Sequence, residues 1–431
     1  MSSAAPPALL LEQVQLLEGP DQPPQHTTVL LEAGAFSAQG EAARQRGAAL
    51  GLTALAAEGW LLAPCLVDPH SQLEDPWLGS AETLASLERS AIAAGYGTVA
   101  LLPRAHSWRD RPDRLQPLAP AGPLQWLLWG SFSRGGEGQE LAAHGDQLAA
   151  GAIGLAEADH CPPLALLERG LNLGEFGRAP LLLAPRDAAL SLHGFVREGV
   201  EALRAGWPPD PVVSETVPLQ SLLALARHHG GARLQLMNLS TAAAVALLAV
   251  LPPEGRPEAT VCWWHLLADS AGLDPLAEGW RVVPPLGTPA DRLALQGALA
   301  EGLISAVAVH HQAIDREEHL LPLDQRKPGV AGHRFVLPCL WRELVEGAGW
   351  SPQQLWRALC FGPAQLLGLE PPRLQPGSQR WLLFDPAQRW SPARDPMAPL
   401  AANQPLADGE LCGRVLACGL NPGLWQGPPL A

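Results

Sequence analysis

Lysine and tyrosine are almost absent from this sequence of 431 residues, and basic side chains as a whole are few. Lys327 is the only lysine and Tyr96 the only tyrosine, whereas tryptophan occurs 15 times. Lysine and arginine together number 29 against 43 aspartates and glutamates, which gives a formal net charge of −14. The chain therefore lacks the basic surface that binding to nucleic acid requires. A site that depends on a buried or modified lysine is excluded unless Lys327 supplies it.

Paired cysteines, long apolar runs and a leader-like start are also missing. The seven cysteines are odd in number, scattered and without a C-x-x-C pair, so neither a disulfide framework nor a thiolate zinc site is predicted. The sequence contains no run of about 18 or more apolar residues, which is the length that a bilayer-crossing helix requires. The N-terminus lacks the charged segment and cleavage site of a signal peptide. We expect a soluble cytoplasmic protein with no nucleic-acid or membrane partner.

Short apolar segments alternate with helical periodicity through the middle of the chain. The joints between them are short and rich in proline and glycine, as β/α connections usually are. Eight such segments predict an α/β fold with a closed parallel (β/α)8 barrel. A doubly wound open sheet is the alternative, which is disfavoured because no G-x-G-x-x-G follows a strand. The predicted strands are 62–67, 98–102, 124–129, 152–155, 180–183, 233–237, 259–263 and 305–309, and the predicted helices 81–94, 139–149, 188–204, 219–228, 242–250 and 290–301.

The sequence pattern at the two ends of the chain differs from that in the middle. Short strand-like runs separated by turn residues occur in 1–61, and they return in 373–431. Strands on both sides of a barrel predict one small β domain built from both termini, with the barrel over 62–372. The segment 385–406, rich in proline, arginine and tryptophan, is expected to be a surface loop that closes this domain.

The first predicted barrel strand ends in the string Asp68-Pro69-His70-Ser71-Gln72. Chemistry in a barrel lies at the carboxyl ends of the strands. An Asp-x-His-x-His string would place two imidazoles on one side of an extended segment, where both could bind one metal ion. Only His70 is present here. Gln72 keeps the spacing, but its amide is a poor ligand beside an imidazole.

Residues 62–103, LAPCLVDPHSQLEDPWLGSAETLASLERSAIAAGYGTVALLP, resemble without a gap the dihydroorotase pattern V-x-P-G-x-V-D-x-H-x-H-L-R-E-P-G and its M-P-N-T. Later landmarks follow in the family's order: LMNLST at 236–241, VVPPL at 282–286, KPGVAG at 327–332 and ANQPL at 402–406. The resemblance covers nearly the whole chain. It implies a TIM-type (β/α)8 barrel of the amidohydrolase kind with a small β-sandwich formed from both termini.

The resemblance also implies a reaction. Dihydroorotase hydrolyses the cyclic amide of dihydroorotate reversibly to N-carbamoyl-aspartate, a step of pyrimidine biosynthesis. One or two zinc ions generate the hydroxide nucleophile and polarise the amide carbonyl, and an aspartate on the last strand serves as acid and base. Each of these functions depends on positions that can be carried over to this sequence.

Most of the family's metal-binding positions have changed. His70 matches the first histidine, and Glu157 lies near the bridging carboxylate, whose carbamylated-lysine version is excluded by the position of the only lysine. The other three histidine positions hold Gln72, Ala184 and Asn238. Glutamine and asparagine are poor metal ligands, and alanine is not a ligand at all. From the resemblance we therefore expect no metal at these remnant positions.

The catalytic and substrate positions have changed as well. His310 stands where the family has its acid/base aspartate, and His311 keeps the histidine that follows. Adjacent strand residues point to opposite faces, so at most one of the two is expected inside the barrel. Glu74 replaces the arginine that binds the substrate carboxylate, and Arg104 and Val283 replace two substrate-binding asparagines. No catalytic or substrate-binding role is assigned to these residues.

Three hypotheses stay open at this point. The first is a dihydroorotase-like pseudoenzyme with a structural or regulatory role towards aspartate carbamoyltransferase, since inactive family members act as scaffolds for that enzyme; a homodimer is a further expected assembly. The second is an active cyclic-amide hydrolase with a rearranged zinc site of His70, Glu157 and His310. The third is a small-molecule binding protein that uses Arg104 and Arg186 at the barrel mouth.

A second pair of histidines, His228 and His229, is followed by two glycines. Cationic side chains near a helix C-terminus and glycine at the cap are typical of a helix end. We interpret this pair as structural.

Overall fold

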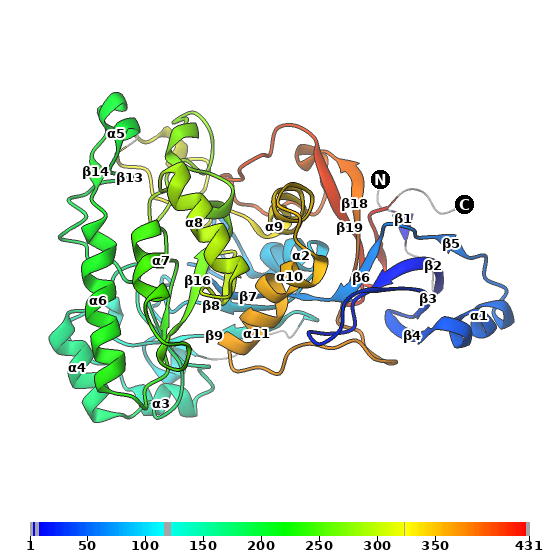
Figure 1. The fold of residues 1–431 in the computed structure, drawn as a ribbon, viewed down its shortest axis with the longest axis horizontal. Coiled ribbons are helices and arrows are strands. Elements are labelled where there is room, and N and C mark those ends of the chain that lie inside the picture. The colour runs from blue at the N-terminus through cyan, green and yellow to red at the C-terminus, as the bar shows by residue number, and fades with distance from the viewer. Residues whose placement is uncertain (1–2, 5–7, 116–121, 323, 428–431) are drawn as a thin grey trace.

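The computed structural model describes residues 3–4, 8–115, 122–322 and 324–427 (Figure 1). The middle of the chain forms a barrel of parallel strands with helices around it. The first and last segments lie side by side at one end of the molecule, where they form a common β domain (Figure 1). In the described part of the chain, no helix is both long and apolar enough to cross a bilayer.

The barrel has eight strand positions, all parallel, in the described residues. β9 and β10 share one position, because only Trp129 separates them and its N–H donates to Leu101 O over 2.9 Å. Three strands form one sheet, in the order β7 (Leu66–Ser71), β8 (Tyr96–Leu101), β9 (Gln125–Leu128). Six form the other, in the order β10 (Gly130–Ser131), β11 (Leu155–Ala156), β12 (Leu181–Leu183), β15 (Leu234–Leu236), β16 (Glu258–Cys262), β17 (Ala306–Ala308).

Backbone hydrogen bonds close the barrel between its first and last strands. His310 N–H donates to His70 O over 3.1 Å, and Gln72 N–H donates to His311 O over 2.8 Å. The strands are apolar on both faces, as parallel strands covered by helices must be, and every residue of β12 and β17 is buried. The predicted barrel is confirmed.

Helices follow the strands around the barrel, and threonine caps begin several of them. Thr83, Thr241 and Thr288 each accept a hydrogen bond from a backbone N–H of the first turn. The helices are α2 (Leu84–Ala93), α3 (His144–Ala149), α4 (Leu164–Leu173), α5 (Val200–Ala205), α6 (Val213–His228), α7 (Ala242–Ala249), α8 (Pro289–Ala300), α9 (His333–Leu340), α10 (Pro352–Trp356) and α11 (Gly362–Leu366). π-Helical segments at Trp341–Gly347 and Arg357–Phe361 continue α9 and α10.

One helix prediction is wrong, and one helix was not predicted. The expected helix at 188–204 is helical only in α5, because Leu192 and His193 have positive φ angles of 52° and 59° and a short strand follows. This strand, β13 (Val196–Arg197), pairs with β14 (Pro209–Asp210). The sequence reasoning also did not predict α4. The helices expected at 242–250 and 290–301 are confirmed by α7 and α8.

The strand expected at 62–67 is in fact two strands that belong to different domains. β6 (Leu61–Pro64) lies in the terminal β domain, where it pairs with β2 and β18, whereas β7 begins at Leu66 in the barrel. Both halves are apolar and buried, so hydrophobic periodicity carries no mark of the change from one sheet to the other.

The terminal β domain combines strands from both ends of the chain, as expected. Its main sheet has the order β19-β18-β6-β2-β3-β4, with β5 on β2, and β1 pairs with β20. Leu11 and Val14 pack in one core with Trp381 and Leu383. The strands are β1 (Ser3–Ala4), β2 (Ala8–Leu16), β3 (Gln25–Glu32), β4 (Ala35–Gln39), β5 (Leu55–Ala56), β18 (Trp381–Trp390), β19 (Leu411–Cys418) and β20 (Leu424–Trp425), and α1 spans Gly40–Ala49.

The loop expected at 385–406 begins later than predicted. β18 runs on to Trp390, which is buried and donates from Nε1 to Gly413 O over 2.8 Å. This tryptophan fastens the end of β18 to β19, so the strand continues through a stretch whose proline and arginine content favoured a loop. The part from 391 to 406 contains only one 3-10 turn, Pro392–Arg394.

Candidate functional site

The candidate positions lie together at the mouth of the barrel, where the carboxyl ends of the strands meet. His70 is in β7, and the other four lie within two residues of the ends of their strands: Glu157 after β11, Ala184 after β12, Asn238 after β15 and His310 after β17. The strands thus place each side chain at the edge at which barrels carry chemistry. What these side chains do there is decided by their contacts.

His70 and His310 contact each other directly. Their Nδ1 atoms lie 3.1 Å apart, and their rings meet edge to face with centroids 5.1 Å apart. One Nδ1 carries the proton that the other accepts. The second nitrogen of His70, Nε2, lies 2.9 Å from Thr260 Oγ1, so both ring nitrogens of this histidine are bound by protein atoms.

Burial keeps these histidines neutral. Removal from water lowers the pKa of His70, His310 and His311, and the neighbouring ring of His310 lowers that of His70 further. A neutral imidazole has one donor and one acceptor nitrogen. At neutral pH the rings therefore act as uncharged hydrogen-bonding groups inside the barrel.

Two residues at the mouth have left-handed backbone conformations. His310 has φ 47° and Asn238 has φ 54°, in a region that few residues other than glycine adopt. Asn238 N–H donates to Thr260 Oγ1 over 2.9 Å, so the Thr260 hydroxyl holds both this turn and His70. The sequence reasoning missed Thr260, which lies within a buried strand and carries no motif.

Glu157 bonds to Ser133 through both carboxylate oxygens. Its Oε2 accepts from Ser133 N–H over 2.9 Å and its Oε1 from Ser133 Oγ over 2.7 Å. Burial raises the pKa of this carboxyl group, and the bonds from Ser133 act against that rise. Glu157 therefore fixes the segment after β10.

The residues at the family's substrate positions bind one another. Arg104 NH1 donates to Asp159 Oδ2 over 2.9 Å, and Arg104 Nε lies 3.9 Å from Glu74 Oε1. Gln72 Nε2 donates to the other oxygen of Asp159 over 3.3 Å. Val283 contributes only an apolar side chain from the loop before α8. The charged groups that could have bound a substrate are thus already paired.

The mouth contains a cavity of about 280 Å³ whose charged lining residues are mostly acidic. Its charged lining residues are Glu74, Asp75, Glu82, Asp315 and Glu318 on the acidic side, and Arg104 and Lys327 on the basic side. Lys327 Nζ lies 3.7 Å from Glu74 and 3.5 Å from Glu318, so this cation is paired as well. A ligand with carboxylate groups would meet an excess of like charge.

Asp68, the first residue of the degenerate motif, joins three elements of the barrel. Its Oδ1 accepts from Val309 N–H over 3.0 Å, and its Oδ2 accepts from Ser71 Oγ and lies 3.0 Å from His333 Nε2. Asp68 is fully buried and links β7 to the end of β17 and the start of α9. The sequence reasoning missed this role, although the motif already contained the residue.

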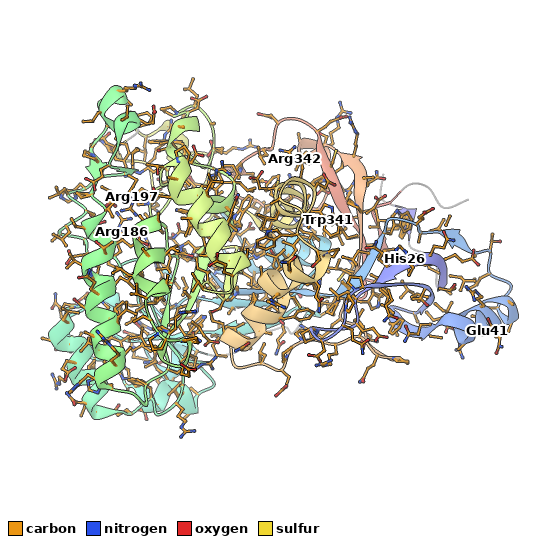
Figure 2. All side chains as sticks on the ribbon, viewed as in Figure 1. His26, Glu41, Arg186, Arg197, Trp341 and Arg342 are labelled. Atoms are coloured by element: carbon orange, nitrogen blue, oxygen red, sulfur yellow. The ribbon has the colours of Figure 1, made fainter. Side chains whose placement is uncertain are left out.

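Arg186 is bound within the protein. Its NH2 donates to Asp210 Oδ2 over 2.6 Å, and Arg197 NH1 donates to Asp210 Oδ1 over 3.3 Å. Figure 2 shows Arg186 and Arg197 close together, beside the upper part of α6. Arg197 NH2 also donates to Ser240 Oγ over 2.7 Å. The guanidinium group proposed for ligand binding thus belongs to a buried ion cluster.

Known proteins resemble this chain over most of its length. A protein of Synechocystis sp. named a probable dihydroorotase-like protein is 37% identical over 84% of this chain and 88% of its own. The dihydroorotase of Anaeromyxobacter dehalogenans is 30% identical over 81% of this chain and 83% of its own. The chain belongs to the dihydroorotase family. No family model matches it.

Solved structures of two hydantoinases share the fold of this dihydroorotase-family protein. The L-hydantoinase of Arthrobacter aurescens superimposes with a TM-score of 0.76 at 18% identity and covers 97% of both chains. The D-hydantoinase of a Thermus species gives a TM-score of 0.74 at 18% identity, over 96% of this chain and 94% of its own. At this identity the likeness concerns the fold, and it confirms the barrel with its β-sandwich.

The zinc that the dihydroorotase family uses does not fit these residues. A zinc site needs three or four donor atoms that converge on one point. Ala184 offers none, both nitrogens of His70 are bound, and Glu157 is held by Ser133. Across the described residues, the one group of three His, Cys, Asp or Glu side chains with donor atoms within 4.8 Å of one another lies elsewhere, at Glu168, His228 and His229.

Buried polar atoms without a protein partner do occur at the mouth. They are His310 Nε2, Asn238 Oδ1 and both ring nitrogens of His311. His310 Nε2 lies 3.8 Å from Asp159 Oδ1, and His311 Nε2 lies 3.7 Å from Glu82 Oε2. Ordered water satisfies isolated polar atoms of this kind. The two adjacent histidines face different neighbours, His70 and His333.

Proposed function

We propose that this dihydroorotase-family protein is a pseudoenzyme with a structural or regulatory role and that aspartate carbamoyltransferase is its partner. The contact between His70 and His310, with their Nδ1 atoms 3.1 Å apart, carries the first part of this proposal. It joins the retained metal-ligand position to the acid/base position by a direct hydrogen bond between their side chains. The family's reaction needs both positions free.

Two further features support the loss of hydrolysis. An acid/base residue must exchange a proton with the reacting group. His310 is buried and its Nδ1 is bound to His70, so only its Nε2, which lies 3.8 Å from Asp159 Oδ1, is left to exchange a proton. A dihydroorotate carboxylate at the family position would also lie beside Glu74, in a mouth with an acidic lining.

The rearranged hydrolase remains the competing proposal. It requires the Glu157 carboxylate, both oxygens of which accept a bond from Ser133, to share a metal ion with His70 and His310. A small-molecule binding role has one observation in its favour, the cavity of about 280 Å³ at the mouth. Its acidic lining favours a neutral or cationic compound over the anions of the dihydroorotase reaction.

Turnover of dihydroorotate tests the loss of catalysis. The purified chain would be incubated with zinc and assayed both for dihydroorotate hydrolysis and for cyclisation of N-carbamoyl-aspartate. We expect no rate above that of a His70→Ala variant whose folding is verified by circular dichroism. Zinc-dependent turnover that His70→Ala abolishes would establish the rearranged hydrolase and overturn the proposal.

Association with the carbamoyltransferase tests the proposed role. The tagged chain would be mixed with untagged aspartate carbamoyltransferase from the same organism, and the mixture separated by size-exclusion chromatography with light scattering. We expect a complex of defined mass, and the chain alone shows in the same experiment whether it is a homodimer. Separate elution of the two proteins at micromolar concentrations contradicts the scaffold role.

A further inference from the structure

A second group of metal-ligating side chains lies on the outside of the barrel. It consists of Glu168 on α4, His228 at the last position of α6 and His229 directly after it. Their donor atoms all lie within 4.8 Å of one another. Figure 1 shows α4 and α6 side by side at the left of the molecule, and an ion pair between His229 and Glu168 joins them.

The three side chains are already arranged around one point. His229 Nε2 lies 2.8 Å from Glu168 Oε2, and the two imidazole rings are 4.8 Å apart at 89°. Asn172 Nδ2 donates to Glu168 Oε1 over 3.1 Å, which orients the carboxylate. Such a second contact is what holds a ligating side chain in place in metal sites.

The surroundings of this group favour a cation. α6 ends at His228, so the unpaired carbonyl groups of its last turn give this end of the helix a partial negative charge. Gly230 and Gly231 follow, and no other heavy atom lies within 4 Å of where a Cβ would stand on either glycine. The backbone that follows the histidines is thus uncrowded, and His228 itself is exposed to solvent.

This cluster lies at the end of the barrel away from the mouth. α6 runs back from the carboxyl end of β12, and the chain enters β15 a few residues after His229. The C-terminus of such a helix lies at the amino ends of the strands. An ion bound here would be remote from His70 and His310, and the inference is independent of the proposed function.

We propose that Glu168, His228 and His229 form a binding site for a divalent transition metal ion, with zinc as the ion. Two imidazoles and one carboxylate are a ligand set that zinc accepts, and water completes the coordination at an open position. The ion replaces the hydrogen bond between His229 and Glu168 and joins α4 to α6. Zinc found in the purified protein would then belong to this cluster.

Zinc titration of the full chain tests the site. The protein is treated with EDTA, dialysed and titrated with ZnCl2 in a calorimeter, and we expect one equivalent to bind. His228→Gln and Glu168→Gln should each weaken binding about tenfold or more, because each removes one ligand. His106→Gln, at another exposed histidine, is the matched control and should bind as the wild type does.

Cobalt supplies a second readout that does not depend on stability. Co2+ added to the metal-free chain should give the visible absorption of a four-coordinate ion, and His228→Gln should lose it. Titrations in which wild type shows no saturable binding overturn the proposal. So does binding that both His228→Gln and Glu168→Gln retain in full, since the ion would then lie elsewhere.

Discussion

Histidines occupy both ends of this barrel, and the two groups are used in opposite ways. At the mouth, His70 and His310 are buried, and they bond to each other. At the amino end, His228 and His229 lie at the surface beside a carboxylate, with their donor atoms converging. The residue type is the same, but the environment and the direction of the ring nitrogens differ.

This difference shows what a metal site requires besides histidine. An imidazole binds metal through a nitrogen lone pair, so an ion must replace any hydrogen bond that occupies this nitrogen. At the mouth the bond to be replaced is the buried one between His70 and His310, whereas at the other end it is the more exposed one between His229 and Glu168. At the mouth, His70 bonds to neighbouring side chains through both ring nitrogens. The strands still place these residues at the mouth, and the family fold is kept although Gln72, Ala184 and Asn238 stand at three of its histidine positions.

Removing Asp68 should have the largest effect on stability and should sharpen the contrast between the two ends. Asp68→Ala leaves three buried donors without an acceptor, from Val309, Ser71 and His333, and we expect the free energy of unfolding to fall by about 3 kcal/mol or more. Urea unfolding in EDTA measures it. In the same assay, His228→Gln should change stability by less than about 0.5 kcal/mol.

Equal effects of Asp68→Ala and His228→Gln would contradict this account, because the buried network would then contribute no more than a surface residue. Asp68→Asn serves as the matched control. It keeps the side-chain volume and one acceptor oxygen, so we expect a loss between those of the other two variants.

Zinc should stabilise the protein only through the cluster of Glu168, His228 and His229 at the amino ends of the barrel strands. At a zinc concentration of a hundred times Kd, binding to the native state adds about 2.7 kcal/mol to the free energy of unfolding. Thermal unfolding with and without ZnCl2 measures the shift. Glu168→Gln, which should weaken binding about tenfold or more, should reduce the shift to about 1.4 kcal/mol or less at the same zinc concentration. A shift that persists undiminished in this variant places the ion at another site.

Acid should destabilise the folded protein through its buried histidines. Burial lowers the pKa of His265 from 6.5 to about 4, so the unfolded chain binds a proton between these values that the folded chain does not. Stability is therefore present above pH 6.5 and falls towards pH 4, by up to about 1.4 kcal/mol per pH unit for this residue.

Urea unfolding of the wild type and of the His265→Gln variant, compared across this pH range, checks the prediction. The glutamine amide can still donate to Pro284 O, the partner of His265 Nε2 at 2.9 Å, but it takes up no proton. The variant should lose stability less steeply than the wild type as the pH falls. Identical slopes would show that His265 does not contribute.

The sequence predicted those parts of the fold that follow from local pattern. The strand at 305–309 and the helix at 290–301 lie where apolar periodicity placed them. The division of 62–67 between two sheets was not predictable, because both halves are equally apolar and only their partners differ. The helix at 188–204 failed because the left-handed turn at Leu192 and His193 has no glycine at those positions to mark it.

For the site, the resemblance identified the positions but not their contacts. It indicated that Gln72, Ala184 and Asn238 cannot replace histidine ligands. That His70 bonds to His310 depends on a left-handed turn after β17, which no spacing rule reveals. The pairing of His229 with Glu168 joins residues 61 positions apart on two helices, so the sequence supported only the interpretation of His228 and His229 as a helix end.

The most direct test of the central claim is the zinc content of a Glu168→Gln/His228→Gln double variant. This protein keeps the barrel mouth intact and lacks the exposed cluster. It would be loaded with zinc, dialysed and measured by inductively coupled plasma mass spectrometry. The account predicts no bound zinc above a buffer blank. One equivalent per chain that stays bound, and that a further His70→Ala substitution removes, would contradict it.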